Sequence, residues 1–107
     1  MDKKVKIVLI YSLSVISIDE LKEALMREGM DEDRARSIAE HIMNFFGFEN
    51  RIIDNYFDND DRSILYFLQD KGIVSSRSEE VYLGGNGKKA WRIFYWILNT
   101  KKIKNLK

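Results

Sequence analysis

The single histidine, His41, is the first side chain to weigh as a general base or a metal ligand. It follows Glu40 within a stretch whose apolar residues recur at helical spacing. A histidine in a catalytic or metal site works with partners such as a second histidine or a cysteine, and the chain contains neither. We therefore expect His41 to lie at the boundary of the core rather than in such a site.

A calcium-binding loop is suggested by a cluster of four aspartates: Asp54, Asp58, Asp60 and Asp61. An EF-hand loop requires glycine at its sixth position and glutamate at its twelfth. Counted from Asp54, those positions hold Asn59 and Leu65, and a count from Asp58 fails in the same way. Aspartate is also a preferred residue at helix N-termini. The cluster therefore predicts the cap of a helix, and we expect no metal.

A glycine-rich run at 84–87, Gly-Gly-Asn-Gly, could be taken for a phosphate-binding loop. Known phosphate loops connect a strand to a helix, whereas this run lies between two predicted strands. It therefore predicts a hairpin turn. With no nucleophile–base pair, metal set or cofactor motif elsewhere, we expect a protein that is not an enzyme and has no cofactor or small-molecule ligand.

The 107 residues are enough for one domain with one core, and the net charge is only +1. The charge is unevenly spread, because residues 77–107 have a net charge of +6 and the rest of the chain −5. Such a basic end is one form of nucleic-acid-binding surface, and a solvated surface is the alternative. The candidate nucleic-acid-binding residues are Arg77, Lys88, Lys89, Arg92, Lys101 and Lys102.

The absence of cysteine excludes disulfides and fits a cytoplasmic protein. An apolar run over residues 7–16 follows three lysines, but no small-residue cleavage site comes after it. The run is also too short to span a bilayer. We therefore expect neither a signal peptide nor a membrane partner.

Two helices are predicted clearly in the first half of the chain. Ser17 and Glu20 form the pattern of a capping box, and Gly29 marks the end of that helix. Asp31 begins the next, which Gly47 ends. Its apolar residues share one face: Ala35, Ile38, Ala39, Ile42, Met43 and Phe46. Residues 5–16 fit a strand and a helix equally well.

The second half predicts further helices and then a hairpin. A short helix is expected over residues 51–57, and a fourth, capped by Asp58 or Asn59, ends at Gly72. Residues 81–83 and 90–98 form the two strands. Residues 101–107 are expected to be a flexible basic tail. The fold class is therefore α+β, mostly helical, with four or five helices followed by a C-terminal β-hairpin.

The return strand of this hairpin is apolar on both faces from residue 94 onward. A two-stranded hairpin usually has one face in water. Either the N-terminal segment covers the second face, as a third strand, or another chain does. The candidate interface residues are Phe94, Trp96 and Leu98.

The stretch 64–74, Ile-Leu-Tyr-Phe-Leu-Gln-Asp-Lys-Gly-Ile-Val, resembles the end of the third helix of winged-helix domains. Residues 79–89 would then be the wing and 91–96 the strand returning from it. The resemblance implies a single winged-helix-like domain over residues 1–100. In DNA-binding members the third helix enters the major groove, but here it carries three aspartates.

Residues 44–48 and the Trp-Arg-x-x-Tyr-Trp strand also resemble small uncharacterised archaeal proteins, which implies an archaeal source. Two functions follow from the residues. The first is a nucleic-acid-associated regulator that binds weakly and without sequence preference through its basic wing. The alternative is a protein-interaction or dimerisation module that uses the aromatic strand.

Overall fold

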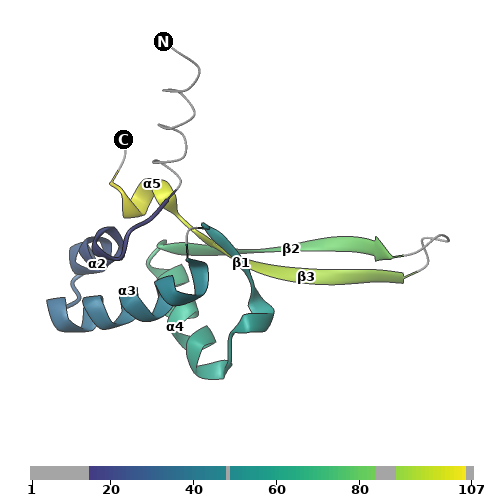
Figure 1. Ribbon diagram of the computed structural model, residues 1–107, viewed down its shortest axis with the longest axis horizontal. Helices are drawn as coiled ribbons and strands as arrows, with labels where there is room; N and C mark the ends of the chain where they lie inside the picture. Colours follow the sequence, from purple (N-terminus) through teal and green to yellow (C-terminus); the bar gives the residue numbers. More distant parts are fainter. Residues whose placement is uncertain (1–14, 48, 84–88, 106–107) are drawn as a thin grey trace, which may run out of the picture.

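A computed structural model describes residues 15–47, 49–83 and 89–105 of the chain. In chain order, the elements are α2 (Ile18–Arg27), α3 (Glu32–Phe46), β1 (Arg51–Ile53), the 3₁₀ turn η1 (Asp54–Tyr56), α4 (Asn59–Asp70), β2 (Val74–Leu83), β3 (Lys89–Leu98) and α5 (Thr100–Ile103). Helices α2, α3 and α4 lie together at one end, and the β2–β3 hairpin projects from them (Figure 1). The predicted α+β class with a C-terminal hairpin is confirmed. The segment 5–16 fitted a strand and a helix equally well; its residues 5–14 lie outside the described residues, and residues 15 and 16 belong to neither kind of element.

The predicted helix boundaries of the first half are confirmed. The Ser17 hydroxyl accepts a hydrogen bond from the Glu20 amide at 3.1 Å, and the Glu20 carboxylate accepts one from the Ser17 amide at 3.0 Å. Asp31 caps α3, and Gly47 ends it with a φ of +59°. Side chains at these caps satisfy amides that a helix start leaves without a partner, so the sequence fixes where each helix begins.

Helix α4 begins at the cap that the aspartate cluster predicts. Asp58 accepts a hydrogen bond from the Asp61 amide at 2.8 Å, and the Asp61 carboxylate accepts one from the Asp58 amide at 3.4 Å. Gly72, after the end of α4, has a φ of +75°, which glycine adopts without strain. Two members of the cluster therefore serve the backbone of this helix.

The predicted helix over residues 51–57 is wrong. Residues 51–53 form strand β1, which pairs antiparallel with β3 so that Ile52 lies opposite Trp96 and Ile53 opposite Tyr95. Only residues 54–56 are helical, as the single turn η1. The isoleucines are β-branched and find a strand partner far along the chain, and this pairing overrides the local pattern.

The sheet has the order β1-β3-β2, with all pairs antiparallel. Its inner face carries Val74, Ser76, Ser78, Glu80 and Tyr82 of β2 with Arg92, Phe94, Trp96 and Leu98 of β3. Its outer face carries Ser75, Arg77, Glu79 and Val81 with Trp91, Ile93, Tyr95 and Ile97. At 10 residues each, β2 and β3 are about 33 Å long.

One core joins the helices to the base of the hairpin. It contains fully buried side chains from α2, α3, α4, β3 and α5 and from the residue before β2: Leu21, Leu25, Ile42, Leu65, Leu68, Ile73, Leu98 and Ile103. The predicted apolar face of α3 is confirmed, since five of its six members are buried and Ile38 is half-buried. The expected flexible tail is wrong for residues 101–103, which are helical because Ile103 packs into this core and Asn99 caps the turn.

Replacing Phe46 by alanine tests this core. Phe46 is 3% exposed and packs near Phe57, with the ring centres 6.5 Å apart. We expect Phe46→Ala to lower the free energy of unfolding by about 3–5 kcal/mol, because it leaves a cavity where an aromatic ring was packed. Urea denaturation measures the change. The control is Glu40→Ala on the exposed side of α3, where we expect a change below about 0.5 kcal/mol. A loss below about 1 kcal/mol for Phe46→Ala would contradict the packing.

Candidate functional site

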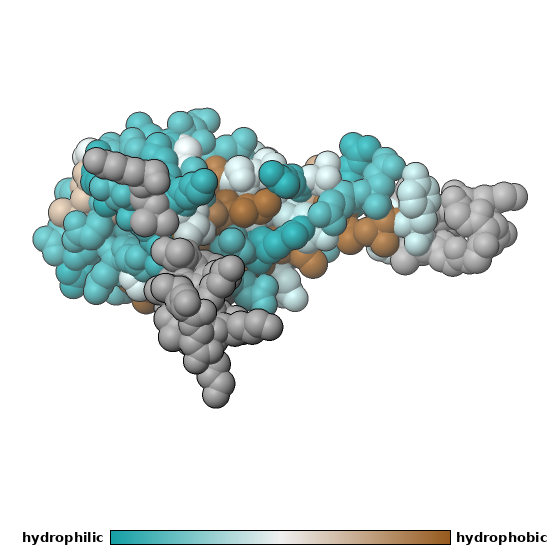
Figure 2. All heavy atoms as spheres, turned by 90° about the horizontal axis from the view of Figure 1, so that it is seen from above, coloured by the Kyte–Doolittle hydropathy of each residue, from teal (hydrophilic) through white to brown (hydrophobic). Residues whose placement is uncertain are grey.

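The projecting half of the hairpin carries large apolar side chains in water. Tyr82 and Phe94 on the inner face are 63% and 54% exposed, and Trp91 on the outer face is 61% exposed. Hydrophobic residues lie along this part of the hairpin among polar ones (Figure 2). A ribbon of two strands has no layer above or below it to cover such residues. We define these three residues as the hairpin aromatics.

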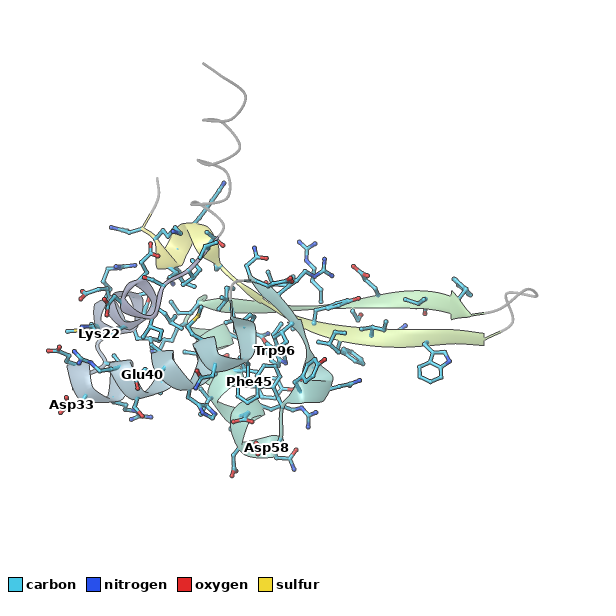
Figure 3. The ribbon with its side chains drawn as sticks, in the orientation of Figure 1. Lys22, Asp33, Glu40, Phe45, Asp58 and Trp96 are labelled. Carbon is cyan, nitrogen blue, oxygen red and sulfur yellow. The ribbon has the colours of Figure 1, made fainter. Side chains whose placement is uncertain are left out.

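The base of the inner face is anchored by Trp96. Its indole Nε1–H donates a hydrogen bond to Oδ1 of Asp54 at 2.7 Å, and its ring meets that of Tyr66 edge to face at 5.3 Å. The guanidinium of Arg62 donates to the same carboxylate, with its Nε 3.0 Å from Oδ2. The cluster thus joins β3 to η1 and α4, at the place where the hairpin leaves the helices (Figure 3).

This burial removes two of the three predicted interface residues from the surface. Trp96 is 4% exposed and Leu98 is 2% exposed, and of the three only Phe94 is accessible to a partner. At the base of the hairpin, α4 and η1 pack against it, and this cover is neither the N-terminal segment nor another chain. The third strand of the described sheet is β1, and the alternative of an N-terminal strand concerns residues outside the described ranges.

On the outer face, the base of the hairpin is held by polar contacts. The guanidinium of Arg51 lies over the ring of Tyr95, 4.3 Å from its centre, and forms an ion pair with Glu79 at 3.2 Å. The Tyr95 hydroxyl donates to the same glutamate at 3.3 Å. Glu79 therefore already has two partners on its own chain.

The described candidate nucleic-acid-binding residues do not form one patch. Arg77 and Arg92 lie on opposite faces of the sheet, and Arg92 forms an ion pair with Glu80 at 3.0 Å. Lys101 and Lys102 lie on α5, against the helices and away from the far end of the hairpin (Figure 1). Lys102 forms an ion pair with Glu28 at 3.1 Å and donates to the carbonyl of Lys71.

Two of these candidates cannot be placed. Lys88 lies outside the described residues, and for Lys89 the structure describes the strand but not the side chain. Arg77 is exposed, and no ion pair to it occurs within the described ranges. The structure thus leaves Arg77 as the described basic side chain of the hairpin that is open to a partner.

His41 has a partner that its position in the sequence does not reveal. Its Nε2–H donates to Oδ1 of Asp61 at 2.6 Å, and its ring meets that of Phe45 edge to face at 5.4 Å. This hydrogen bond is the main reason that the pKa of the Asp61 carboxyl lies below its ordinary value of 3.8. Asp61 is buried and also caps α4, so the pair joins α3 to α4.

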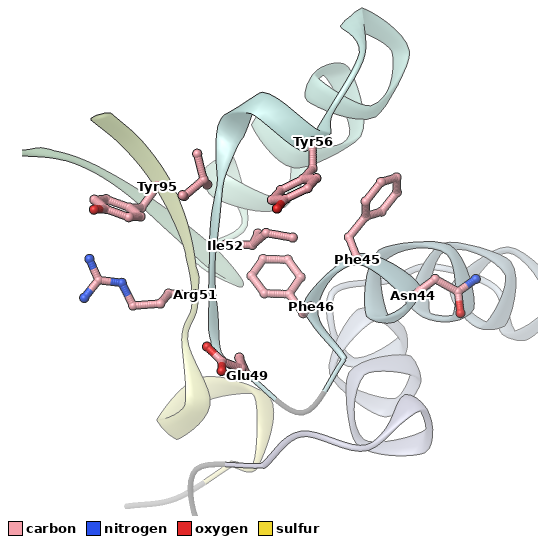
Figure 4. A pocket seen from close by; sticks show the side chains of 9 residues that line it. Asn44, Phe45, Phe46, Glu49, Arg51, Ile52, Tyr56 and Tyr95 are labelled. Atoms are coloured by element: carbon pink, nitrogen blue, oxygen red, sulfur yellow. The ribbon is translucent and has the colours of Figure 1, made fainter. Parts of the chain in front are cut away.

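A groove that the sequence analysis did not predict lies between the end of α3 and β1. It has a volume of about 630 Å³. Phe45, Phe46 and Ile52 line its floor, and Tyr56, which is 69% exposed, stands at its rim (Figure 4). Arg51 and Glu49 supply charge at its edge. Only the strand pairing of β1 creates the groove, which is why no local pattern indicates it.

Neither a metal centre nor a membrane helix occurs in the described part of the chain. Over residues 15–47, 49–83 and 89–105, no three His, Cys, Asp or Glu side chains are grouped as metal ligands would be. Within the same ranges, no helix has the length and apolar composition needed to cross a bilayer.

The anchor of Trp96 predicts an acid-dependent stability. Burial raises the pKa of the Asp54 carboxyl, but hydrogen bonds from Arg62 and Trp96 and the charge of Arg62 outweigh it, so the pKa lies below its ordinary 3.8. A carboxyl with a lowered pKa stabilises the fold above about pH 4 and loses this effect as the pH falls through its folded pKa. Asp54→Asn should therefore lower the free energy of unfolding by about 1–3 kcal/mol at neutral pH.

Urea denaturation at several pH values between about 7 and 2 measures both effects. Because asparagine does not titrate, Asp54→Asn should also lose less stability than the wild type across the acid range. Asp70→Asn, at an exposed position of α4, is the matched control and should keep the wild-type profile. An Asp54→Asn profile parallel to that of the wild type would contradict the role given to this carboxylate.

Comparison with known proteins places the chain in a family. No curated protein and no solved structure matches it. One family model matches residues 13–107, which covers the helices and the whole hairpin. The chain therefore belongs to DUF6015, a family of unknown function.

Proposed function

We propose that this protein is a protein-interaction module that forms a dimer with a second copy of itself through the β2–β3 hairpin. The observation that carries the proposal is the exposure of the hairpin aromatics, which are 63%, 61% and 54% exposed on an element that projects from the body. Large apolar side chains gathered on one projecting element are typical of contact surfaces. Aromatic residues are also enriched where protein partners meet.

The free strand edges support a second copy as the partner. Among the described residues, strand β2 has a neighbour on one side only, and β1 pairs with β3 only at residues 95–97. Unpaired strand edges can add a strand from another chain. A surface shared by two identical chains meets itself across a two-fold axis, so each copy supplies the same edge and the same aromatic residues.

The charges of the hairpin favour this proposal over the nucleic-acid-associated regulator. Arg77 and Arg92 are balanced by Glu79 and Glu80 on the same hairpin, and Arg92 is already in an ion pair. Binding to a nucleic acid depends on basic groups that neutralise phosphates. Arg92 gains little from a phosphate, because it would first give up Glu80. Arg77, for which no ion pair occurs in the described ranges, could by itself neutralise one phosphate only.

Helix α4 has the wrong charge for a nucleic-acid groove. The helices α2, α3 and α4 followed by a hairpin have the order used by winged-helix domains, in which the third helix enters the major groove. Here α4 exposes Asp60 and Asp70, and its one arginine, Arg62, is bonded to Asp54. Its exposed apolar side chains are Tyr66 and Phe67. Carboxylates on this helix would repel the phosphates on either side of the groove.

Removal of two hairpin aromatics tests the proposed function. We expect the wild type to dimerise with increasing concentration, and Tyr82→Ser combined with Trp91→Ser to remain monomeric, because exposed apolar area is lost. Sedimentation velocity over a micromolar concentration series measures this. The matched control is Tyr56→Ser, whose side chain is 69% exposed on the body instead of the hairpin. A strict monomer for the wild type, or dissociation only by Tyr56→Ser, would contradict the proposal.

Nucleic-acid binding separates the two functions. We expect flat fluorescence anisotropy curves for duplex and single-stranded DNA and RNA at about 50 mM salt, since no described basic patch can neutralise several phosphates. The regulator instead predicts binding that weakens about ten- to a hundred-fold between 50 and 200 mM salt. It also predicts that replacing Lys88, Lys89 and Arg92 together by alanine abolishes binding, and that combination of results would favour the regulator.

A further inference from the structure

We infer that two copies of the chain pair through the outer edges of β2, antiparallel, with the two-fold axis at Ser78. This inference rests on the proposed dimer and specifies its geometry. The two sheets would then form one continuous sheet with the strand order β1-β3-β2 in each copy and the two β2 strands side by side in the middle.

The outer edge of β2 is available for such pairing. All ten residues of β2 pair with β3 along one edge of the strand, from Val74 opposite Leu98 to Leu83 opposite Lys89. The outer edge is the other edge of β2, which points away from β3. No backbone partner for the outer side of β2 occurs among residues that the structure describes. The residues from 75 to 80 are all exposed, and three of them are serines: Ser75, Ser76 and Ser78. Small side chains leave room for a second strand to approach this edge.

A two-fold axis restricts the registers that can form. An axis perpendicular to the sheet keeps each residue on its own face, so inner-face residues must lie opposite inner-face residues of the other copy. In each allowed register, one residue therefore lies at the axis, directly opposite the same residue of the partner subunit. In the middle of the strand that residue is Arg77, Ser78 or Glu79.

Charge selects among these three registers. Centring on Arg77 places two arginines opposite each other, and centring on Glu79 places two glutamates opposite each other, which destabilises cross-strand pairing. Centring on Ser78 places Arg77 opposite Glu79 of the partner subunit, twice by symmetry. Charged residues on an edge usually prevent pairing, but here the opposite charges of Arg77 and Glu79 favour the register centred on Ser78 over the other two.

The selected register also uses a side chain that the single chain leaves open. Arg77 is exposed, and no ion pair to it occurs within the described ranges. In the dimer it would reach the partner's Glu79, which Arg51 and Tyr95 of that same subunit already contact at 3.2 and 3.3 Å. Each glutamate would then lie between two arginines on the outer face.

The same register brings exposed apolar residues beside apolar ones. Tyr82, which is 63% exposed, would lie opposite the partner's Val74, the neighbour of the partner's Leu98 in the core. Val81, the neighbour of Trp91, would lie opposite the partner's Ser75, next to the partner's Ile97. The pairing therefore reduces the exposure of the far end of each hairpin against the base of the other.

Because the chain has no cysteine, single cysteines test the register directly. Under mild oxidation, Ser78→Cys should form a disulfide-linked dimer, since the two residues face each other across the axis. Ser76→Cys is on the same face but would lie opposite Glu80 of the partner subunit, with its own copy four residues farther along the strand. That separation of about 13 Å is too long for a disulfide. Ser37→Cys, exposed on α3, reports random collision.

We expect Ser78→Cys to cross-link at least about ten times faster than Ser76→Cys and Ser37→Cys. Arg77→Glu should raise the dissociation constant about tenfold by placing two acids opposite each other, and Arg77→Lys should keep it within about twofold. Circular dichroism and thermal unfolding confirm that each variant is folded.

Faster cross-linking at Ser76→Cys than at Ser78→Cys would overturn the register, and so would equal rates at all three positions. If the aromatic variants abolish the dimer while Ser78→Cys does not cross-link above Ser37→Cys, the dimer stands and the edge pairing is wrong. If the wild type is monomeric and no cysteine cross-links above the control, both the register and the proposed function are wrong.

Discussion

The carboxylate of Asp54 connects the two parts of this molecule. It accepts hydrogen bonds from Trp96 of β3 at 2.7 Å and from Arg62 of α4 at 3.0 Å, so one group joins the hairpin, η1 and the last large helix. Without a partner, a half-buried carboxylate and a buried indole N–H would both lose hydrogen bonds to water. The position of the hairpin relative to the helices therefore depends on this contact and on the core around Leu98.

A firmly held base allows the rest of the hairpin to project. An isolated two-stranded ribbon is marginally stable in water, and this one gains its order from the buried end of β3 and from β1. No segment that the structure describes covers the projecting half in this way, and its aromatic side chains are exposed on both faces. The same strand thus serves the core at one end and presents a contact surface at the other.

An ion pair within the hairpin reduces the number of basic groups that are free to bind a phosphate. The sequence suggests a basic end over residues 77–107, but within it Arg92 is bonded to Glu80. After the hairpin, Lys101 and Lys102 lie on α5, where Lys102 contacts Glu28 and the end of α4. A net charge counted along the chain does not distinguish arginines that are paired from those that are free, and it is the free ones that a phosphate can bind.

The sequence by itself determined the features that depend on neighbouring residues. Ser17, Asp31 and Asp58 cap helices and Gly47 and Gly72 end them, because caps act over three or four residues of the same chain. The helical face of α3 and the glycine-rich run between the two hairpin strands are also visible in short stretches of sequence. The absence of cysteine is a property of the composition and does not depend on the fold.

The tertiary structure decided whatever depends on residues far apart in the chain. Residues 51–53 form a strand because they pair with β3. The buried indole of Trp96 has a hydrogen-bond acceptor in Asp54, which lies 42 positions earlier in the chain. The accessible half of the hairpin and the groove beside β1 follow from those pairings. Local patterns could not show them, since an apolar strand has the same sequence whether a helix, a second chain or water lies against it.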